Sequence, residues 1–195
     1  SSNDVIPSAT HLTAAQAIKD ELVPALEQAR STLAAKSKEF WNVIKTGRTH
    51  LQDATPIRLG QEVSGWAAQM QYGVTRAERA LNRLAENLPI GGTAVGTGLN
   101  APKGYAEKVA KGISHKTGLP FQTAPNKFEA MGAHDSAVGM SGALKTLAAA
   151  LNKIANDIRW LASGPHGGIR EIRLPVLQQG SSITPGIAKV NAVIC

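Results

Sequence analysis

Three long stretches of the chain carry apolar residues at the three-, four- and seven-residue steps of a helix that buries one face. They run from Thr13 to about Lys45, from Thr55 to Leu88, and from about Asn126 to Leu161. No stretch alternates apolar and polar residues as a half-buried strand would. The pattern therefore predicts an all-α fold, an elongated bundle of long antiparallel helices with no sheet beyond stray pairs.

Helix start and stop signals mark the ends of these stretches. Thr13-Ala14-Ala15-Gln16 has the form of a capping box, which predicts the start of the first helix. Pro24 removes a helical hydrogen bond, so a kink or a break is expected near it. Thr55 is predicted as the N-cap of the second helix with Pro56 at its first position. Gly164-Pro165 ends the third helix.

The second and third helices differ in how their apolar residues are arranged. The second has one stripe, made of Leu59, Val63, Trp66, Met70, Val74, Ala77, Leu81, Leu84 and Leu88. The third is apolar nearly all round between Leu147 and Leu151, which indicates burial on more than one side, partly by other subunits. His134 and Asp135 fall inside the third helix, where a satisfied polar pair in the core is favoured over a catalytic pair.

Between the second and third helices lie a glycine-rich segment and a short helix. The segment from Gly91 to Asn100 contains four glycines and two threonines, but no Lys-Ser/Thr follows it as a P-loop requires. We expect a loop whose backbone passes close to another chain or to a small ligand. A short helix is predicted from Gly104 to about Lys116.

The connector between the first two helices is more polar than a turn requires. From Gly47 to Asp53 it reads Gly-Arg-Thr-His-Leu-Gln-Asp. His50 could donate or accept a proton, and Thr49 with the free N–H groups of the next helix could hold an anion. The residues alone leave open whether this is a site or a polar turn between two bundle helices.

Composition narrows the class of protein. The 195 residues are 43% hydrophobic, enough for a core, and carry a formal net charge of +7. The basic residues are scattered and not interleaved with aromatic residues, which argues against a nucleic-acid partner. The lone cysteine, Cys195, excludes an internal disulfide and fits a reducing compartment. Without a membrane span or a signal peptide, the sequence predicts a soluble intracellular protein.

Both ends of the chain carry polar residues that could serve a site. Ser1-Ser2-Asn3-Asp4 is an ordinary capping or turn sequence that also offers hydrogen-bond donors. The last stretch, from Gly164 to Cys195, has no long period and contains two hydroxyls, a cation and an amide between Gly180 and Asn191. This segment suits a linker or a mobile lid.

Three blocks, in order, resemble the signature regions of the fumarase/aspartase superfamily. They are Ser1-Ser2-Asn3-Asp4, the stretch from Gly47 to Asp53, and Gly180-Ser181-Ser182 with Pro185, Lys189 and Asn191. The Gly91-to-Asn100 loop and Asn126-Lys127-Phe128-Glu129-Ala130 are also similar to fumarase. His50 favours class II fumarase, because aspartases carry glutamine there.

The resemblance implies that residues 1–195 form the central helical domain of such an enzyme. The chain lacks an initiator methionine and a polar tail, so we expect it to be cut at both ends, without the N- and C-terminal domains of the family. The family assembles as a homotetramer in which three subunits build each active site. The expected location is cytoplasmic, or mitochondrial in a eukaryote.

The implied reaction is the reversible hydration of fumarate to L-malate, a step of the tricarboxylic acid cycle, with neither metal nor organic cofactor. By resemblance, Ser181 is the base for the C3 proton, with Ser182 as its rival, and His50 acts on the water or hydroxyl at C2. The residues expected to hold the dicarboxylate substrate are Ser1, Ser2, Asn3, Thr49, Lys189 and Asn191.

The last block departs from the family pattern. Thr184 replaces a methionine, Ala192 replaces a proline, and Ile187-Ala188 precede Lys189 as an insertion. The glutamate that pairs with the family's histidine would lie beyond Cys195. The alternatives are therefore a non-catalytic helical bundle that keeps only the assembly surface, or another lyase of the superfamily such as aspartate ammonia-lyase.

Overall fold

The structure, a computed structural model, describes residues 2–175 and divides them into two compact units. Unit 1 contains residues 2–32 and 70–145, and unit 2 contains residues 33–69 and 146–175. The predicted site residues Ser1, Ser181, Ser182, Lys189 and Asn191 lie outside the described residues.

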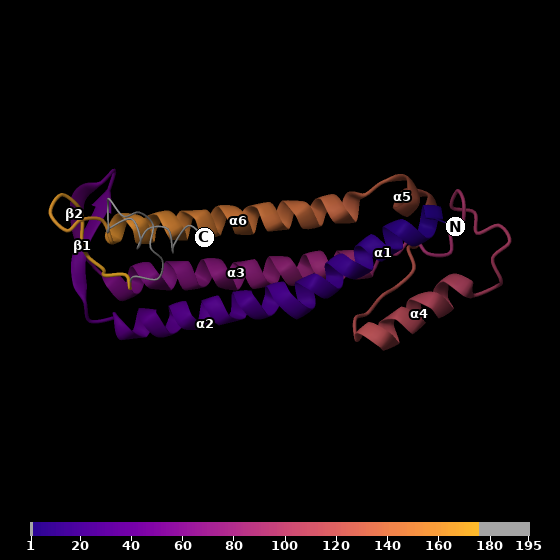
Figure 1. Cartoon of the computed structure of the whole chain (residues 1–195), viewed down its shortest axis with the longest axis horizontal. Helices are drawn as coiled ribbons and strands as arrows, with labels where there is room; N and C mark the ends of the chain where they lie inside the picture. The colour runs from indigo at the N-terminus through magenta and orange to yellow at the C-terminus, as the bar shows by residue number, and fades with distance from the viewer. Residues whose placement is uncertain (1, 176–195) are drawn as a thin grey trace, which may run out of the picture. The chain divides into compact units, whose positions relative to one another are not determined.

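Helices form most of the regular structure, which confirms the predicted all-α class (Figure 1). The elements are α1 (Ser2–Ala17), the π-helical segment η1 (Ile18–Leu22), α2 (Val23–Glu39), β1 (Ile44–Thr49), β2 (Gln52–Arg58), α3 (Leu59–Ala85), α4 (Tyr105–Thr117), α5 (Lys127–Gly132) and α6 (Asp135–Leu161).

The first helix begins at Ser2, so the start predicted at Thr13 is wrong. Thr13 lies inside α1. The buried positions of α1 are Asp4, Ser8, His11 and Ala15. They follow helical spacing but are mostly polar, and for that reason a search for apolar periodicity missed the helix.

Near Pro24, where the sequence predicts a kink or a break, the structure has the π-helical segment η1. The backbone N–H of Val23 donates to the carbonyl of Ile18, five residues back, at the end of η1. A proline has no N–H and its ring clashes with the carbonyl four residues earlier, which is that of Asp20 within η1. The chain accommodates the proline by a π-helical turn, and it continues as α2 without a break.

The apolar stripe of α3 is confirmed at every position. The nine predicted residues are all buried, from 0% exposure for Leu84 and Leu88 to 8% for Leu81. The helix ends at Ala85, and Leu88 instead forms an isolated bridge with Thr123.

The predicted start of that helix is wrong, because residues 44–58 form an antiparallel hairpin. Thr55 and Pro56 lie in β2, and α3 begins at Leu59. A threonine followed by a proline is a strong N-cap signal. Here Pro56 instead pairs with Thr46 in the hairpin.

The third predicted helix is interrupted. Asn126 caps α5, since its side chain accepts from the N–H groups of Phe128 and Glu129, each at 3.0 Å. After α5 the chain is not helical at His134, and α6 starts at Asp135. Both residues are exposed, so the prediction of a core polar pair is wrong.

The apolar stretch of α6 is buried on one face within the chain. Leu147 is 6% exposed, whereas Leu144 is 39% and Leu151 is 45% exposed. Within the described residues, no helix has the length and apolar character needed to cross a membrane.

The glycine-rich loop and the short helix after it are found where the sequence predicts them. The loop packs on its own chain: the N–H groups of Gly91 and Thr93 both donate to the carboxylate of Asp4, at 3.0 Å. A Cβ on Gly91 would lie 2.4 Å from that of Ala106 in α4, so the close approach requires glycine.

Candidate active site

The hairpin of unit 2 presents Thr49 and His50 at its tip. Thr49 pairs with Gln52, so a two-residue turn of His50 and Leu51 joins the strands. The φ angles are 53° at His50 and 60° at Leu51, as a type I′ turn requires. Glycine and asparagine usually occupy such positions. A leucine there costs about 1–2 kcal/mol, and the turn places the histidine at a fixed point of the backbone.

A bulge shapes the strands below the turn. The pairs Thr46–Pro56 and Arg48–Asp53 leave two residues between them on β2 but one, Gly47, on β1. A Cβ on Gly47 would lie 2.5 Å from the carbonyl oxygen of Thr55, so the bulge requires glycine here. Bulges raise the local twist of a strand pair and redirect side chains.

The imidazole of His50 is exposed and borders a cavity of about 700 Å³ within unit 2. The cavity is lined by residues of the hairpin, the first turn of α3, the end of α6 and the segment after it: Lys45, Arg48, His50, Leu51, Ile57, Gln61, Glu62, Asp157, Trp160, Leu161 and Ile169. An imidazole in this position can exchange a proton with a small molecule that enters the cavity.

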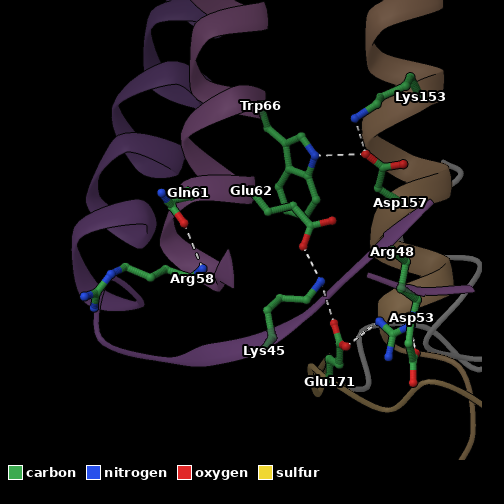
Figure 2. A network of polar contacts seen from close by, with 10 residues as sticks. All are labelled: Lys45, Arg48, Asp53, Arg58, Gln61, Glu62, Trp66, Lys153, Asp157 and Glu171. Atoms are coloured by element: carbon green, nitrogen blue, oxygen red, sulfur yellow. Dashed lines mark hydrogen bonds and ion pairs between the residues drawn. The ribbon is translucent and has the colours of Figure 1, made fainter. Parts of the chain in front are cut away.

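Four charged side chains from β1, α3 and the segment after α6 form a paired cluster (Figure 2). Lys45 of β1 pairs with Glu62 of α3 and, at 2.6 Å, with Glu171. Arg48 pairs with the other oxygen of Glu171 at 2.5 Å, and more loosely, at 3.8 Å, with the exposed Asp53. The side chain of Lys45 is 8% exposed and that of Glu171 is 15% exposed. The partly buried cluster thus balances two cations with two carboxylates.

The pKa of the Glu171 carboxyl follows from this cluster. Burial alone would raise that pKa, but hydrogen bonds from Lys45 and Arg48, together with their charges, outweigh burial and lower it. The same contact raises the pKa of the Arg48 guanidinium, chiefly through its hydrogen bond to Glu171. Glu171 is therefore ionised at neutral pH and serves as a fixed anion between the two cations.

Next to the hairpin, side chains link α2 and α6 to α3 within unit 2. The indole of Trp66 donates to Asp157 at 3.0 Å, and Asp157 also pairs with Lys153 (Figure 2). The hydroxyl of Ser37 donates to the carbonyl of Gly60 at 2.7 Å, where α2 and the start of α3 come into close contact.

The structure brings together two of the predicted site residues, Thr49 and His50, and places two others in unit 1. Ser2 is the exposed first residue of α1. The side-chain amide of Asn3 donates to the carbonyl of Ala94 at 2.8 Å. Asn3 therefore also helps to hold the glycine-rich loop, a role that its sequence position did not suggest.

Sequence reasoning missed the charged cluster that supports the hairpin. The sequence predicts Lys45 at the end of a helix, and Glu171 lies in a stretch that shows no periodicity. The available signal was the spacing of Lys45 and Arg48 just before Thr49, which places two cations beside the proposed site. Among residues 2–175, no group of three or more histidine, cysteine, aspartate or glutamate side chains could hold a metal ion.

Comparisons with known proteins find the same similarity along the whole chain. A fumarate hydratase class II from Ralstonia nicotianae is 60% identical over 98% of this chain, and one from Neisseria meningitidis is 56% identical over 100% of it. The chain spans 41% and 42% of the length of these two relatives.

Solved structures show the same similarity to class II fumarases. The crystal structure of a class II fumarase from Schistosoma mansoni matches 100% of this chain and 43% of its own, with 39% identity and a TM-score of 0.95. These similarities confirm the resemblance to class II fumarases that the signature blocks indicate. The family model described as lyase matches residues 1–195, and the chain therefore belongs to this lyase family.

Proposed function

We propose that the chain is part of an enzyme that reversibly adds water to fumarate to give L-malate. The observation that carries the proposal is the intact block from Gly47 to Asp53, which places Thr49 and His50 at the hairpin tip, in a chain 60% identical to a fumarate hydratase class II. No metal or organic cofactor takes part in the proposed reaction. The proposed location is cytoplasmic, or mitochondrial in a eukaryote.

The chemistry requires a base, an acid and fixed positive dipoles. Removal of the C3 proton beside a carboxylate creates an aci-carboxylate dianion, which must be stabilised where it forms. We assign the base to Ser181, with Ser182 as its rival, and the handling of water or hydroxyl at C2 to His50. A serine needs desolvation and nearby N–H groups to act as a base, which fits a lid that closes over the substrate.

The charge balance of the cluster limits which groups could hold the substrate. Lys45 and Arg48 are neutralised by Glu62 and Glu171, so neither offers a free positive charge to a carboxylate. We assign the cation to Lys189, and the remaining contacts to Ser1, Ser2, Asn3, Thr49 and Asn191.

Assembly is part of the proposal. Leu144 and Leu151 expose apolar surface on α6 that residues 2–175 leave uncovered, which supports association with further copies. We propose a homotetramer in which different subunits supply the Ser1-Ser2-Asn3, Thr49-His50 and Ser181 segments of each site.

The test is an assay of the full-length protein that follows the ultraviolet absorbance of fumarate. His50→Asn should lower kcat by about a hundredfold or more, the usual contribution of a positioned acid or base. Ser181→Ala should lower it at least as much, and Ser182→Ala, measured in parallel, decides between the two serines. Full turnover in Ser181→Ala, with an intact tetramer, would exclude the assigned base.

The same assay separates this proposal from its alternatives. The altered loop residues Thr184 and Ala192 favour a non-catalytic bundle, and in that case the unmodified full-length protein would assemble without turning over fumarate. Release of ammonia from aspartate would instead indicate an aspartate ammonia-lyase.

A further inference from the structure

Glu171 connects the end of α6 to the strand that carries His50. Its backbone N–H donates to the carbonyl of Leu161, the last residue of α6, at 2.8 Å, and the N–H of Ile172 donates to the same carbonyl at 3.2 Å. The backbone of Glu171 is thus fixed to a helix end. Its side chain then extends from this fixed point toward β1 (Figure 2).

The carboxylate of Glu171 contacts β1 at two positions. One oxygen lies 2.5 Å from Nη1 of Arg48 and the other lies 2.6 Å from Nζ of Lys45. Side chains three residues apart on a regular strand point to opposite faces. Both cations nevertheless reach one carboxylate, which the added twist at the Gly47 bulge accommodates.

These contacts hold the end of β1, which leads directly into the turn that contains His50. Arg48 is followed directly by Thr49 and by the two-residue turn, so a rotation of β1 at Arg48 moves the imidazole. The backbone of the turn is conformationally restricted, because both of its residues have positive φ angles. The direction of His50 is therefore set below the turn, at the contacts of Arg48 and Lys45.

Removal of the Glu171 charge would leave Lys45 and Arg48 with unequal carboxylate partners. Lys45 would retain Glu62, whereas the ion pair left to Arg48 within residues 2–175 would be the 3.8 Å contact to Asp53, whose side chain is 84% exposed. A partly buried cation that loses its partner is unfavourable. We therefore expect Arg48 to turn toward water and β1 to become less firmly held at this position.

We propose that Glu171 is a positioning residue, which holds the Thr49–His50 turn at a fixed orientation by clamping Lys45 and Arg48 against the end of α6. The proposal rests on the function proposed above, in which His50 must meet the substrate. It assigns no contact between Glu171 and the substrate.

The test compares Glu171→Gln with Glu39→Gln in the full-length protein. Glu39 is paired with Lys36 at 2.8 Å but is 56% exposed on α2, so the control makes the same chemical change away from the hairpin. We expect Glu171→Gln to lower kcat by about ten- to hundredfold, the cost of a misplaced group, with KM changed by less than about threefold. Glu39→Gln should change neither constant.

Hydrogen exchange of the amides of residues 44–58, measured by mass spectrometry, provides a second readout. In Glu171→Gln these amides should exchange about tenfold faster while those of α3 and α6 keep their rates. Unchanged exchange in the hairpin, or faster exchange throughout the chain, would overturn the positioning role. If Glu171→Gln does not fold, Glu171→Asp keeps the charge on a shorter arm and should show the same pattern to a smaller degree.

The exchange measurement does not depend on turnover. If the unmodified protein does not hydrate fumarate, the proposed function fails, and the hairpin amides still decide whether Glu171 holds the turn. If the protein is active and Glu171→Gln keeps its full kcat, the positioning role fails and the proposed function stands.

Discussion

The imidazole of His11 lies in the core of unit 1, although histidine is usually a surface residue. It is 3% exposed, on the face of α1 that also buries Asp4, Ser8 and Ala15. Burial lowers its pKa below the ordinary value of 6.5; a hydrogen bond to the backbone of Leu84 acts in the opposite direction but does not outweigh burial. The folded chain therefore favours the neutral ring.

This burial predicts that the fold loses stability in mild acid. The unfolded chain takes up a proton at His11 near pH 6.5, whereas the folded chain resists it to lower pH. The free energy of unfolding should therefore fall as the pH drops below 6.5, by at most about 1.4 kcal/mol per pH unit from this group. Urea titrations from pH 7.5 to 5 measure the effect.

A matched pair of variants isolates the contribution of His11. His11→Gln keeps a side chain that can hydrogen-bond. It should reduce the fall in the free energy of unfolding below pH 6.5, which we call the acid limb. His115→Gln, at an exposed position of α4, should leave that limb unchanged. Equal pH dependence in both variants would assign the acid limb to other groups.

At the scale of elements, the bulge of the hairpin depends on a single glycine, Gly47. A methyl group on Gly47 would lie 2.5 Å from the carbonyl oxygen of Thr55, which is backbone and cannot rotate away. Gly47→Ala should therefore lower the free energy of unfolding by about 1–3 kcal/mol, and should speed hydrogen exchange of residues 44–58.

Gly65→Ala is the control, for which we expect a change of opposite sign in the free energy of unfolding. Gly65 lies inside α3, and an added Cβ would meet nothing within 4 Å. Alanine there should raise the free energy of unfolding by about 0.5–1 kcal/mol. Both variants are measured by urea denaturation; a Gly47→Ala protein as stable as the unmodified one would contradict the tight bulge.

The same elements show what the sequence could predict. The stripe of α3 was found completely because each of its apolar residues is buried along one helix face. The start of α1 and the hairpin were not, for two physical reasons. The buried face of α1 is mostly polar, so it carries no apolar stripe. The strands of the hairpin contain a bulge and charged pairs, and they lack the alternation of apolar and polar residues by which a strand is recognised. Thr55-Pro56 added a false helix start.

At the scale of the whole molecule, the sequence indicates one part of the candidate site and the three-dimensional structure adds another. The block around His50 could be recognised from its residues, but the cluster of Lys45, Glu62 and Glu171 required three-dimensional contacts between distant segments. The Ser181 and Lys189 segment lies outside the described residues. The proposed subunit contacts require more than one copy of the chain.

Assembly can be tested on the exposed apolar residues of α6. Leu151→Glu places a charge at a position that is 45% exposed in one chain and covered in the proposed oligomer. Since a buried unpaired charge is unfavourable, association should weaken about tenfold or more in sedimentation velocity experiments. Lys111→Glu, on α4, introduces the same side chain elsewhere and should leave association unchanged; equal sedimentation of both variants would contradict the proposed contact.

The two-residue turn at His50 and Leu51 also limits how this protein can change in length. Strand register is set by the turn type and the loop length, and a slip of that register by one residue would turn every side chain of one strand to its other face. If an insertion in the turn made β1 slip by one residue, it would turn Lys45 and Arg48 away from Glu171 at the same time as it displaced His50. Substitutions can therefore accumulate around the turn, whereas an insertion or deletion that shifts the register would displace the proposed site residue His50 and its support together.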